Sequence, residues 1–384
     1  MRVLVFSTDD HLYPAGGAES AMGEIMKRLP DVEFDLITAR LRKTASHEEH
    51  IGNVHIYRLG FGIPRIDGYI LALFGHLLAL RLHKKNPYDL MWCMMASYGA
   101  FSAVRVKKRT GIPILLTLQE GDSIEYILNK VRFVRSAFNT IFKSADGLQP
   151  ISQFLLSWGK DMGFSGIAHV IPNGVDVSSF TASFSADELA ETRKNFGFSD
   201  GAYVLITSSR LEIKNGVGDV IDALLLMPEV CFVICGSGSL EEKLRAQVQT
   251  LGLMNRVKFL GFVKITDLPK LFKSSDAFIR PSLSEGLGNA FLEALSTRLP
   301  TIGTPVGGIP DFLIEGETGF LCEPHNPESI ARAVSRIRSL PHAAREQIAE
   351  TGYQRVLSTY NWDRIAASMR LFFEEVTRHA GRRT

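Results

Sequence analysis

Short, nearly continuous apolar runs alternate along the chain with longer segments in which apolar residues recur every three or four positions. The short runs indicate strands that are buried on both faces, and the longer segments indicate helices. This alternation predicts an α/β fold in which helices cover both faces of a parallel sheet. The strands expected in the first half are residues 2–7, 33–38, 89–94, 112–118 and 147–151.

A second alternating series follows a polar passage at residues 178–200, which predicts a linker and a short helix. A chain of 384 residues is long enough for two domains that each bury a core. We therefore expect two tandem Rossmann-like domains, residues 1–176 and 177–361, with a ligand cleft between the carboxyl ends of their strands. The strands expected in the second half are residues 203–207, 230–235, 257–260, 277–280 and 301–303.

The overall charge is nearly balanced, with 43 Lys and Arg against 41 Asp and Glu, and gives no reason to expect nucleic acid as a partner. The four cysteines lie in apolar surroundings without metal-ligand spacing, as is typical of free thiols in a reducing cytoplasm. The N-terminal apolar run is too short for a signal peptide. The apolar stretch at 69–80 falls short of the roughly 20 residues that span a bilayer, so no transmembrane segment is expected. The sequence therefore predicts a cytoplasmic protein.

The most informative stretch is residues 280–295, where a predicted strand ends, a turn of small residues follows and a helix begins near Gly288. Glycine allows backbone amides to approach a ligand closely, and a helix N-terminus attracts an anion such as a pyrophosphate. Glu285 precedes this helix and Glu293 lies inside it, so one carboxylate could meet a sugar hydroxyl and the other a ribose. The alternative is an ordinary strand, turn and helix with two solvated glutamates.

Two basic residues, Arg210 and Lys214, lie four positions apart after the first strand of the second domain. On that loop both could neutralise a diphosphate, which carries about two negative charges near neutral pH. No Asp-x-Asp motif occurs in the sequence, so we expect these side chains to supply the positive charge in place of a metal ion. The alternative is a solvated basic loop.

Two further glycine pairs follow predicted strands. Gly16 and Gly17 come after the first strand but lack the spacing of a dinucleotide fingerprint, which disfavours a hydride-transfer enzyme. Gly236 and Gly238 end a strand of the second domain and could bring the backbone close to a nucleotide.

Together these residues resemble the glycosyltransferase family 4 enzymes of GT-B fold. The two glutamates with seven residues between them are that family's signature, and the joint order of the motifs over nearly the whole chain is highly specific. The motifs that carry the resemblance are Glu285 with Glu293, Arg210 with Lys214, Gly16-Gly17, and residues 173–176, 307–311 and 317–321.

The resemblance implies a nucleotide diphosphate sugar donor held mainly by the C-terminal domain. Arg210 and Lys214 would contact its phosphates, Glu293 its ribose, and Glu285 the transferred sugar. It also implies retention of anomeric configuration, and the absence of an Asp-x-Asp motif leads us to expect that no metal ion is needed. Other implied contacts are the backbone of Gly286, Leu287, Gly288 and Asn289 beside the sugar, Val263 near the base, Gly16 and Gly17 near the phosphates, and a last helix (362–384) that packs back on the first domain.

One position departs from the family pattern. Such enzymes often carry a His after the strand at 114–118, whereas this chain has Gln119, which cannot carry a proton. Glu120 or Asp122 could take over an acid–base role on the acceptor side. The alternative is a polar loop that only shapes the acceptor site.

These observations predict a retaining glycosyltransferase that acts on a sugar or lipid-linked hydroxyl acceptor in polysaccharide, glycolipid or other glycoconjugate synthesis. The alternatives are a nucleotide-sugar epimerase of the same fold and a non-catalytic nucleotide-sugar-binding subunit. Apolar residues at helical spacing with interspersed basic residues, at 124–142 and 69–85, predict peripheral contact with an anionic membrane at its inner face. Helices that pack against the core would explain that pattern equally well.

Overall fold

The computed structural model describes residues 1–10 and 17–381, which form two compact units. The first unit comprises residues 1–174 together with the segment from Trp362 onward, and the second comprises Val175–Asn361. The sequence placed these boundaries at 176/177 and 361/362. Every strand predicted from the sequence is present at nearly the predicted residues.

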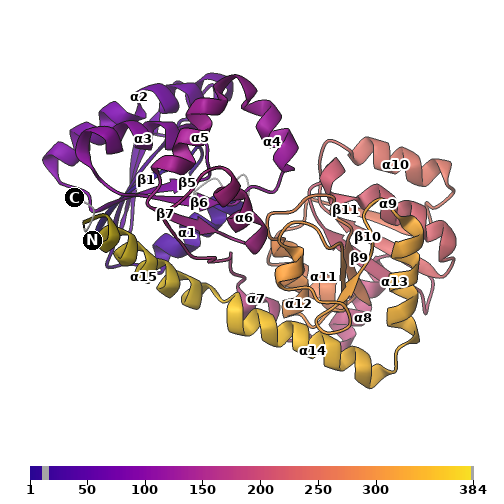
Figure 1. The fold of residues 1–384 in the computed structure, drawn as a ribbon. Coiled ribbons are helices and arrows are strands. Elements are labelled where there is room, and N and C mark those ends of the chain that lie inside the picture. Colours follow the sequence, from indigo (N-terminus) through magenta and orange to yellow (C-terminus); the bar gives the residue numbers. More distant parts are fainter. Residues whose placement is uncertain (11–16, 382–384) are drawn as a thin grey trace. The chain divides into compact units, whose positions relative to one another are not determined.

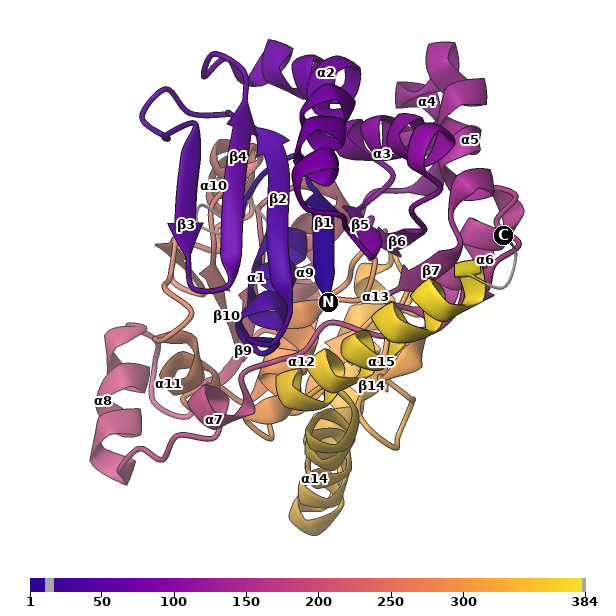
Figure 2. The same ribbon diagram turned by 90° about the vertical axis from the view of Figure 1, so that its left-hand side faces the viewer.

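The first unit contains an eight-stranded sheet in the order β3-β4-β2-β1-β5-β6-β7-β8. Figure 2 shows the strands from β3 to β1 side by side. All neighbours are parallel except β3 and β4, which pair antiparallel at one edge and which the sequence analysis missed. The strands are β1 (Arg2–Phe6), β2 (Glu33–Ala39), β3 (Glu48–Ile51), β4 (Val54–Leu59), β5 (Leu90–Met94), β6 (Ile114–Leu118), β7 (Gly147–Pro150) and β8 (Ile167–Ala168).

Helices cover both faces of this sheet (Figure 1). One face packs against α2 (Pro64–Lys85), α3 (Tyr98–Thr110) and α5 (Arg135–Ser144), and the other against α1 (Gly17–Lys27) and α15 (Trp362–Gly381). Alternation along β1 explains the arrangement, because Val3 and Val5 join the core beneath α1 and α15 while the Phe6 side chain meets α3. The helix α6 (Gln153–Asp161) packs beside β7.

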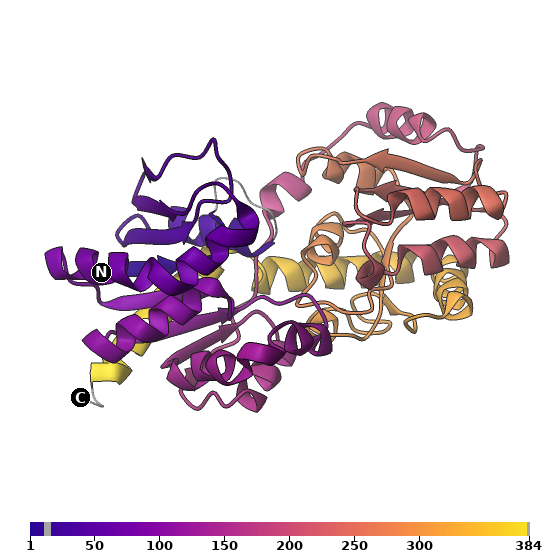
Figure 3. The same ribbon diagram turned by 90° about the horizontal axis from the view of Figure 1, so that it is seen from above.

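The last helix is part of the first unit's core. In Figures 1 and 3, α15 is drawn yellow and lies against the indigo and purple elements of that unit. The Phe373 ring lies 5.3 Å from that of Trp92 and 6.4 Å from that of Phe34, measured between ring centroids. Residues from the end of the chain thus complete a core that is built mostly from its beginning.

The second unit contains a six-stranded, wholly parallel sheet in the order β11-β10-β9-β12-β13-β14. Counted within the unit this is the doubly wound order 3-2-1-4-5-6, in which the direction of winding reverses between β9 and β12. The strands are β9 (Tyr203–Ser208), β10 (Val230–Cys235), β11 (Val257–Gly261), β12 (Ala277–Arg280), β13 (Thr301–Gly303) and β14 (Phe320–Leu321).

The helices of the second unit follow its strands in alternation, and two short helices lie in the polar passage that precedes β9. The core joins strand residues such as Leu205 and Ile234 to the apolar faces of the flanking helices. The helices are α7 (Val177–Phe180), α8 (Ala186–Asn195), α9 (Val217–Ala223), α10 (Glu241–Thr250), α11 (Leu268–Lys273), α12 (Asn289–Ser296), α13 (Pro327–Ser339) and α14 (His342–Thr359).

Two helical predictions need correction. The pattern at 124–142 forms two helices, α4 (Ile124–Lys130) and α5, joined by a single 3-10 turn at Arg132–Val134. None of the α4 residues is buried, so no core contact holds the two segments in one helix. The apolar stretch at 69–80 belongs to a helix of 22 residues, α2, which by length and composition alone could cross a membrane.

Candidate active site

The point where the second sheet reverses its winding brings together two loops that the sequence singled out. In open α/β sheets, ligands bind outside the carboxyl ends of the strands at such a point. The loop after β9 carries Arg210 and Lys214, and the loop after β12 carries Glu285. The two loops are joined directly, because the Leu283 backbone N–H donates to the Lys214 carbonyl oxygen at 2.7 Å.

Local backbone geometry fixes the basic loop. Gly216 has a φ of +66°, and an added Cβ there would overlap the carbonyl oxygen of Pro281, so the two loops approach closely only because this residue is glycine. The buried Asn215 amide donates to the Arg210 carbonyl oxygen at 2.5 Å. Arg210 is exposed and Lys214 is half-buried. The structure therefore holds the two cations on one short, well-anchored segment.

The helix α12 begins at Asn289, as the sequence predicted, directly after Gly288. Gly288 has a φ of +105° and, being glycine, provides no side chain to cap the helix. The first amides of such a helix point outward and carry its partial positive charge, which is the arrangement that binds phosphate. Gly286, Leu287 and Gly288 are buried, which leaves their backbone in a fixed position beside Glu285.

Glu285 is held from two sides. Its carboxylate forms an ion pair of 2.5 Å with Arg280, the last residue of β12. Its carbonyl oxygen accepts from the backbone N–H of Gly308 at 3.3 Å, and the neighbouring Gly307 has a φ of +56°. The motif at 307–311 is one of those that carry the family resemblance, but no role was assigned to it. In the structure it packs against the backbone of Glu285. Arg280 was missed by sequence reasoning, although a charged residue at the end of a buried strand was a usable signal.

Glu293 lies one turn inside α12. Burial raises the pKa of its carboxyl to about 7, and the nearby Arg280 guanidinium opposes that rise in pKa. A carboxyl with this pKa changes charge near neutral pH, so its ability to accept a hydrogen bond from a ligand hydroxyl depends on pH in that range.

A small pocket of about 240 Å³ lies beside the basic loop at the same edge of the sheet. It brings together Arg210, Gly236 and Val263, three residues that the sequence analysis assigned to the donor. The Ser209 hydroxyl, also in its lining, is buried and has no hydrogen-bond partner among the described residues, and the Phe262 ring is 80% exposed. Gly238 does not line this pocket and instead packs against the backbone of Leu211.

The acceptor-side candidates lie at the carboxyl edge of the first sheet, after β6. The Gln119 side-chain oxygen accepts from the Asn173 amide at 3.0 Å. Glu120 is only 6% exposed, and burial raises the pKa of its carboxyl to about 7. One of its oxygens accepts from the Ala96 N–H at 3.3 Å, and the other has no partner among the described residues. Asp122 is half-buried on the loop that follows.

The glycine pair after β1 is described only in part. Gly17 is the exposed first residue of α1, and Gly16 lies outside the described residues. Across the ranges 1–10 and 17–381, no group of three or more His, Cys, Asp or Glu side chains is arranged to hold a metal ion.

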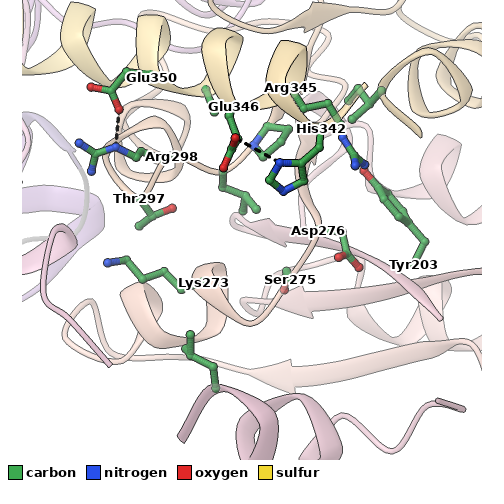
Figure 4. A pocket seen from close by; sticks show the side chains of 15 residues that line it. Tyr203, Lys273, Ser275, Asp276, Thr297, Arg298, His342, Arg345, Glu346 and Glu350 are labelled. Carbon is green, nitrogen blue, oxygen red and sulfur yellow. Dashed lines mark hydrogen bonds and ion pairs between the residues drawn. The ribbon is translucent and has the colours of Figure 1, made fainter. Parts of the chain in front are cut away.

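A larger groove of about 860 Å³ lies at the opposite, amino edge of the second sheet (Figure 4). Its charged side chains largely pair with one another or with neighbouring residues. Arg298 contacts Glu350 at 2.5 Å, His342 contacts Glu346 at 3.1 Å, and Asp276 contacts Arg193 at 2.7 Å. The sequence motifs are all absent from its lining. The carboxyl edge is therefore the better candidate for the site.

Known protein families match both halves of the chain. The family described as Glycosyltransferase Family 4 matches residues 15–179, and the one described as Glycosyl transferases group 1 matches residues 189–355. The chain belongs to glycosyltransferase family 4. Its two sheets are the two Rossmann-like domains of the GT-B fold.

Individual relatives agree with this family. An uncharacterized glycosyltransferase of Methanocaldococcus jannaschii is 33% identical over 203 residues, about half of each chain, and a second from the same organism is 24% identical over 95% of this chain and 96% of its own. A GDP-mannose-dependent monoacylated alpha-(1-6)-phosphatidylinositol monomannoside mannosyltransferase of Corynebacterium glutamicum is 29% identical over 73% of this chain and 74% of its own.

Solved structures of the same fold cover nearly the whole chain. Sucrose-phosphate synthase of Thermosynechococcus elongatus superposes with a TM-score of 0.85 at 20% identity, over 98% of both chains. The Anabaena protein Alr3699/HepE, in complex with UDP-glucose, gives a TM-score of 0.77 at 21% identity, over 98% of this chain and all of its own.

Proposed function

We propose that this family 4 enzyme transfers a sugar from a nucleotide diphosphate sugar to a hydroxyl acceptor, with retention of anomeric configuration and without a metal ion. The observation that carries the proposal is the joined pair of loops after β9 and β12. They place two cations, a carboxylate and the N-terminus of α12 at one edge of one sheet.

The proposed roles follow from charge. Arg210, Lys214 and the first amides of α12 bind the diphosphate, and Glu293 accepts from the ribose. The pocket beside Arg210 receives the nucleoside, with the exposed Phe262 ring at its rim. Glu285 contacts the sugar that is transferred.

In the proposed reaction, the bond from the anomeric carbon to the leaving phosphate oxygen breaks first. The negative charge that develops on the diphosphate is stabilised by Arg210, Lys214 and the helix amides. The acceptor oxygen then bonds to the anomeric carbon from the same face, and its proton passes to the departing phosphate oxygen. This route needs no pair of carboxylates at glycosidase spacing.

Two experiments test this function. A thermal-shift panel of sugar nucleotides in the presence of a chelator should give at least one hit, because a ligand that binds the folded state raises its stability. With that donor, the nucleoside diphosphate should be released only when an acceptor is present, since turnover by an epimerase needs no acceptor and a binding subunit turns nothing over. Activity that disappears with the chelator and returns with a divalent metal would contradict the metal-independent mechanism.

For the acceptor we propose a lipid-linked or membrane-associated molecule, because the outer face of α2 suits a membrane surface. This outer face is apolar, and each of its residues is at least 40% exposed. On the helix its members are Ile66, Tyr69, Leu73, Phe74 and Leu77, and in the segment directly before the helix Phe61 and Ile63 are exposed to a similar degree.

The charges on α2 complement an anionic lipid surface. Arg81, Lys84 and Lys85 are exposed at its C-terminal end. Its single acidic residue, Asp67, is fully buried and accepts from the backbone N–H groups of Phe61, Gly62 and Ile63. Apolar and basic side chains without exposed acids are typical of helices that lie on anionic membranes.

A second surface feature of the first unit, the turn at Arg132–Val134, also combines an exposed apolar side chain with basic residues. Phe133 is 87% exposed in the turn between α4 and α5, with Arg132 and Arg135 on either side. Large exposed apolar side chains flanked by cations point to the same kind of partner.

Vesicle sedimentation tests the membrane contact. We expect the protein to bind vesicles containing anionic phosphatidylglycerol at low salt and to bind less at high salt. The double variant Leu73→Asp/Phe74→Asp should abolish binding, whereas Leu225→Asp, at an equally exposed position in the second unit, should not. No binding at low salt, or equal loss in both variants, would remove this part of the proposal.

We further propose a cytoplasmic location at the inner face of the membrane. All four cysteines are free and buried, which supports a reducing compartment.

A further inference from the structure

Arg280 is an almost buried cation in the middle of the candidate active site. It is 7% exposed, and its Nη2 contacts the Glu285 carboxylate at 2.5 Å. Its Nε donates to the Ser282 hydroxyl at 3.2 Å. The guanidinium carbon lies 4.7 Å from the centre of the Phe291 ring. Three different groups therefore fix the orientation of this side chain.

Stability alone is a weak reason for such a pair. Removing two charged groups from water costs several kcal/mol per ion, and the attraction between them often no more than offsets that cost. A pair of apolar residues would fill the same space at least as well. The arrangement instead restricts the Glu285 carboxylate to one position at the end of β12.

We propose that Arg280 is a positioning residue for sugar transfer, which holds the Glu285 carboxylate in the orientation that contacts the transferred sugar. This inference rests on the proposed function. Arg280 also opposes the rise in the pKa of Glu293, so it keeps that carboxyl able to accept from a ribose near neutral pH. One guanidinium therefore acts on both members of the family's glutamate pair.

The expected kinetics separate these two effects. In Arg280→Met, loss of the Glu285 orientation should lower kcat about 100-fold, since misplacement of about 1 Å has that effect at reacting centres. Loss of the cation also raises the pKa of Glu293 further, so KM for the donor should rise at pH 7 and return toward the wild-type value at pH 9. Arg280→Lys keeps the charge but not the planar fork, so its KM should stay near the wild-type value while kcat recovers only partly.

A matched control is available in the same unit. Arg298 forms an ion pair of the same length with Glu350, but at the amino edge and partly exposed (Figure 4). Arg298→Met should leave kcat and KM unchanged. In a double-mutant cycle, Glu285→Gln should add little to Arg280→Met, because each change disrupts the same pair.

Two outcomes would overturn the inference. One is an Arg280→Met enzyme that keeps the wild-type kcat and the wild-type dependence of KM on pH. The other is a crystal structure of Arg280→Met, without substrate, in which Glu285 keeps its position. These outcomes differ from a failure of the proposed function, in which the wild-type protein itself would transfer no sugar.

Discussion

Gly307 offers the sharpest test of the arrangement around Glu285. Its φ of +56° lies in the left-handed region, and an ideal Cβ at this position would lie 1.7 Å from the Glu285 carbonyl oxygen. An ordinary van der Waals contact begins at 3.4 Å, so in Gly307→Ala the two backbones must move apart by about 1.7 Å. If the Glu285 loop takes half of that shift, its carboxylate moves by about 1 Å.

The size of the effect follows from this displacement. A misplacement of about 1 Å at a reacting centre lowers turnover about 100-fold, which corresponds to about 2.7 kcal/mol of lost transition-state stabilisation. The left-handed backbone adds a separate cost of about 1–2 kcal/mol to folding stability, because alanine tolerates it poorly. A fully folded protein with a large kinetic defect is the expected outcome.

A control variant at Gly316 separates the loss of folding stability from the loss of turnover. It has a φ of +73°, but an added Cβ there would meet no atom within 4 Å. Gly316→Ala should therefore show the stability loss without the kinetic loss. The assay is kcat/KM for sugar transfer on both variants, alongside their urea unfolding curves. Equal kcat/KM for the two variants would refute the argument that Gly307 positions Glu285.

Three further predictions concern other residues. Arg210→Ala and Lys214→Ala should each lower kcat about 100- to 1000-fold, as expected for loss of a donor at a developing charge, whereas Lys243→Ala on α10 should not; unchanged turnover would contradict the proposed role. The pKa of the Glu120 carboxyl is about 7 in the folded protein and 4.5 for an ordinary side chain. Between these two pH values the carboxyl is protonated in the folded state and ionised in the unfolded state, so the stability of the folded protein falls as pH rises through this range. In Glu120→Gln the free energy of unfolding should fall by up to about 3 kcal/mol less than in the wild type between pH 5 and pH 8, as measured by urea unfolding. An equal fall in the wild type and the variant would refute the argument that burial raises this pKa. Asp67→Ala should reduce stability by about 1–3 kcal/mol in thermal or urea unfolding, because three backbone N–H groups lose their acceptor; an unchanged midpoint would show that water replaces it.

Buried parallel strands were predictable because their apolar runs are nearly continuous. The strand β12, which carries Ala-Phe-Ile-Arg, was predicted at its observed residues. Edge strands were not predictable in the same way. In β4 buried and partly exposed residues alternate, and β3 is mostly polar, so neither produces the signal of a strand buried on both faces. Their pairing depends on the turn between them and on the neighbouring strand β2.

Within the candidate site, residues in local motifs were easier to predict than contacts between distant segments. The start of α12 after Gly288 follows from a glycine-rich turn, which is visible in the sequence. The contact between Arg280 and Glu285 depends on how a loop folds back beside the strand that precedes it. The approach of Gly307 to Glu285 joins loops after two different strands, and nothing in either loop alone indicates the other.

The packing of α15 has a consequence for how the protein is made. Trp92 and Phe34 belong to early strands, but Phe373, which packs against both rings, is made only after the whole of the second unit. The first unit therefore cannot close its core before α15 is made, whereas every strand of the second unit has already been made by then. Until α15 has been made, we expect the growing chain to expose apolar surface around these two rings and to need chaperone protection.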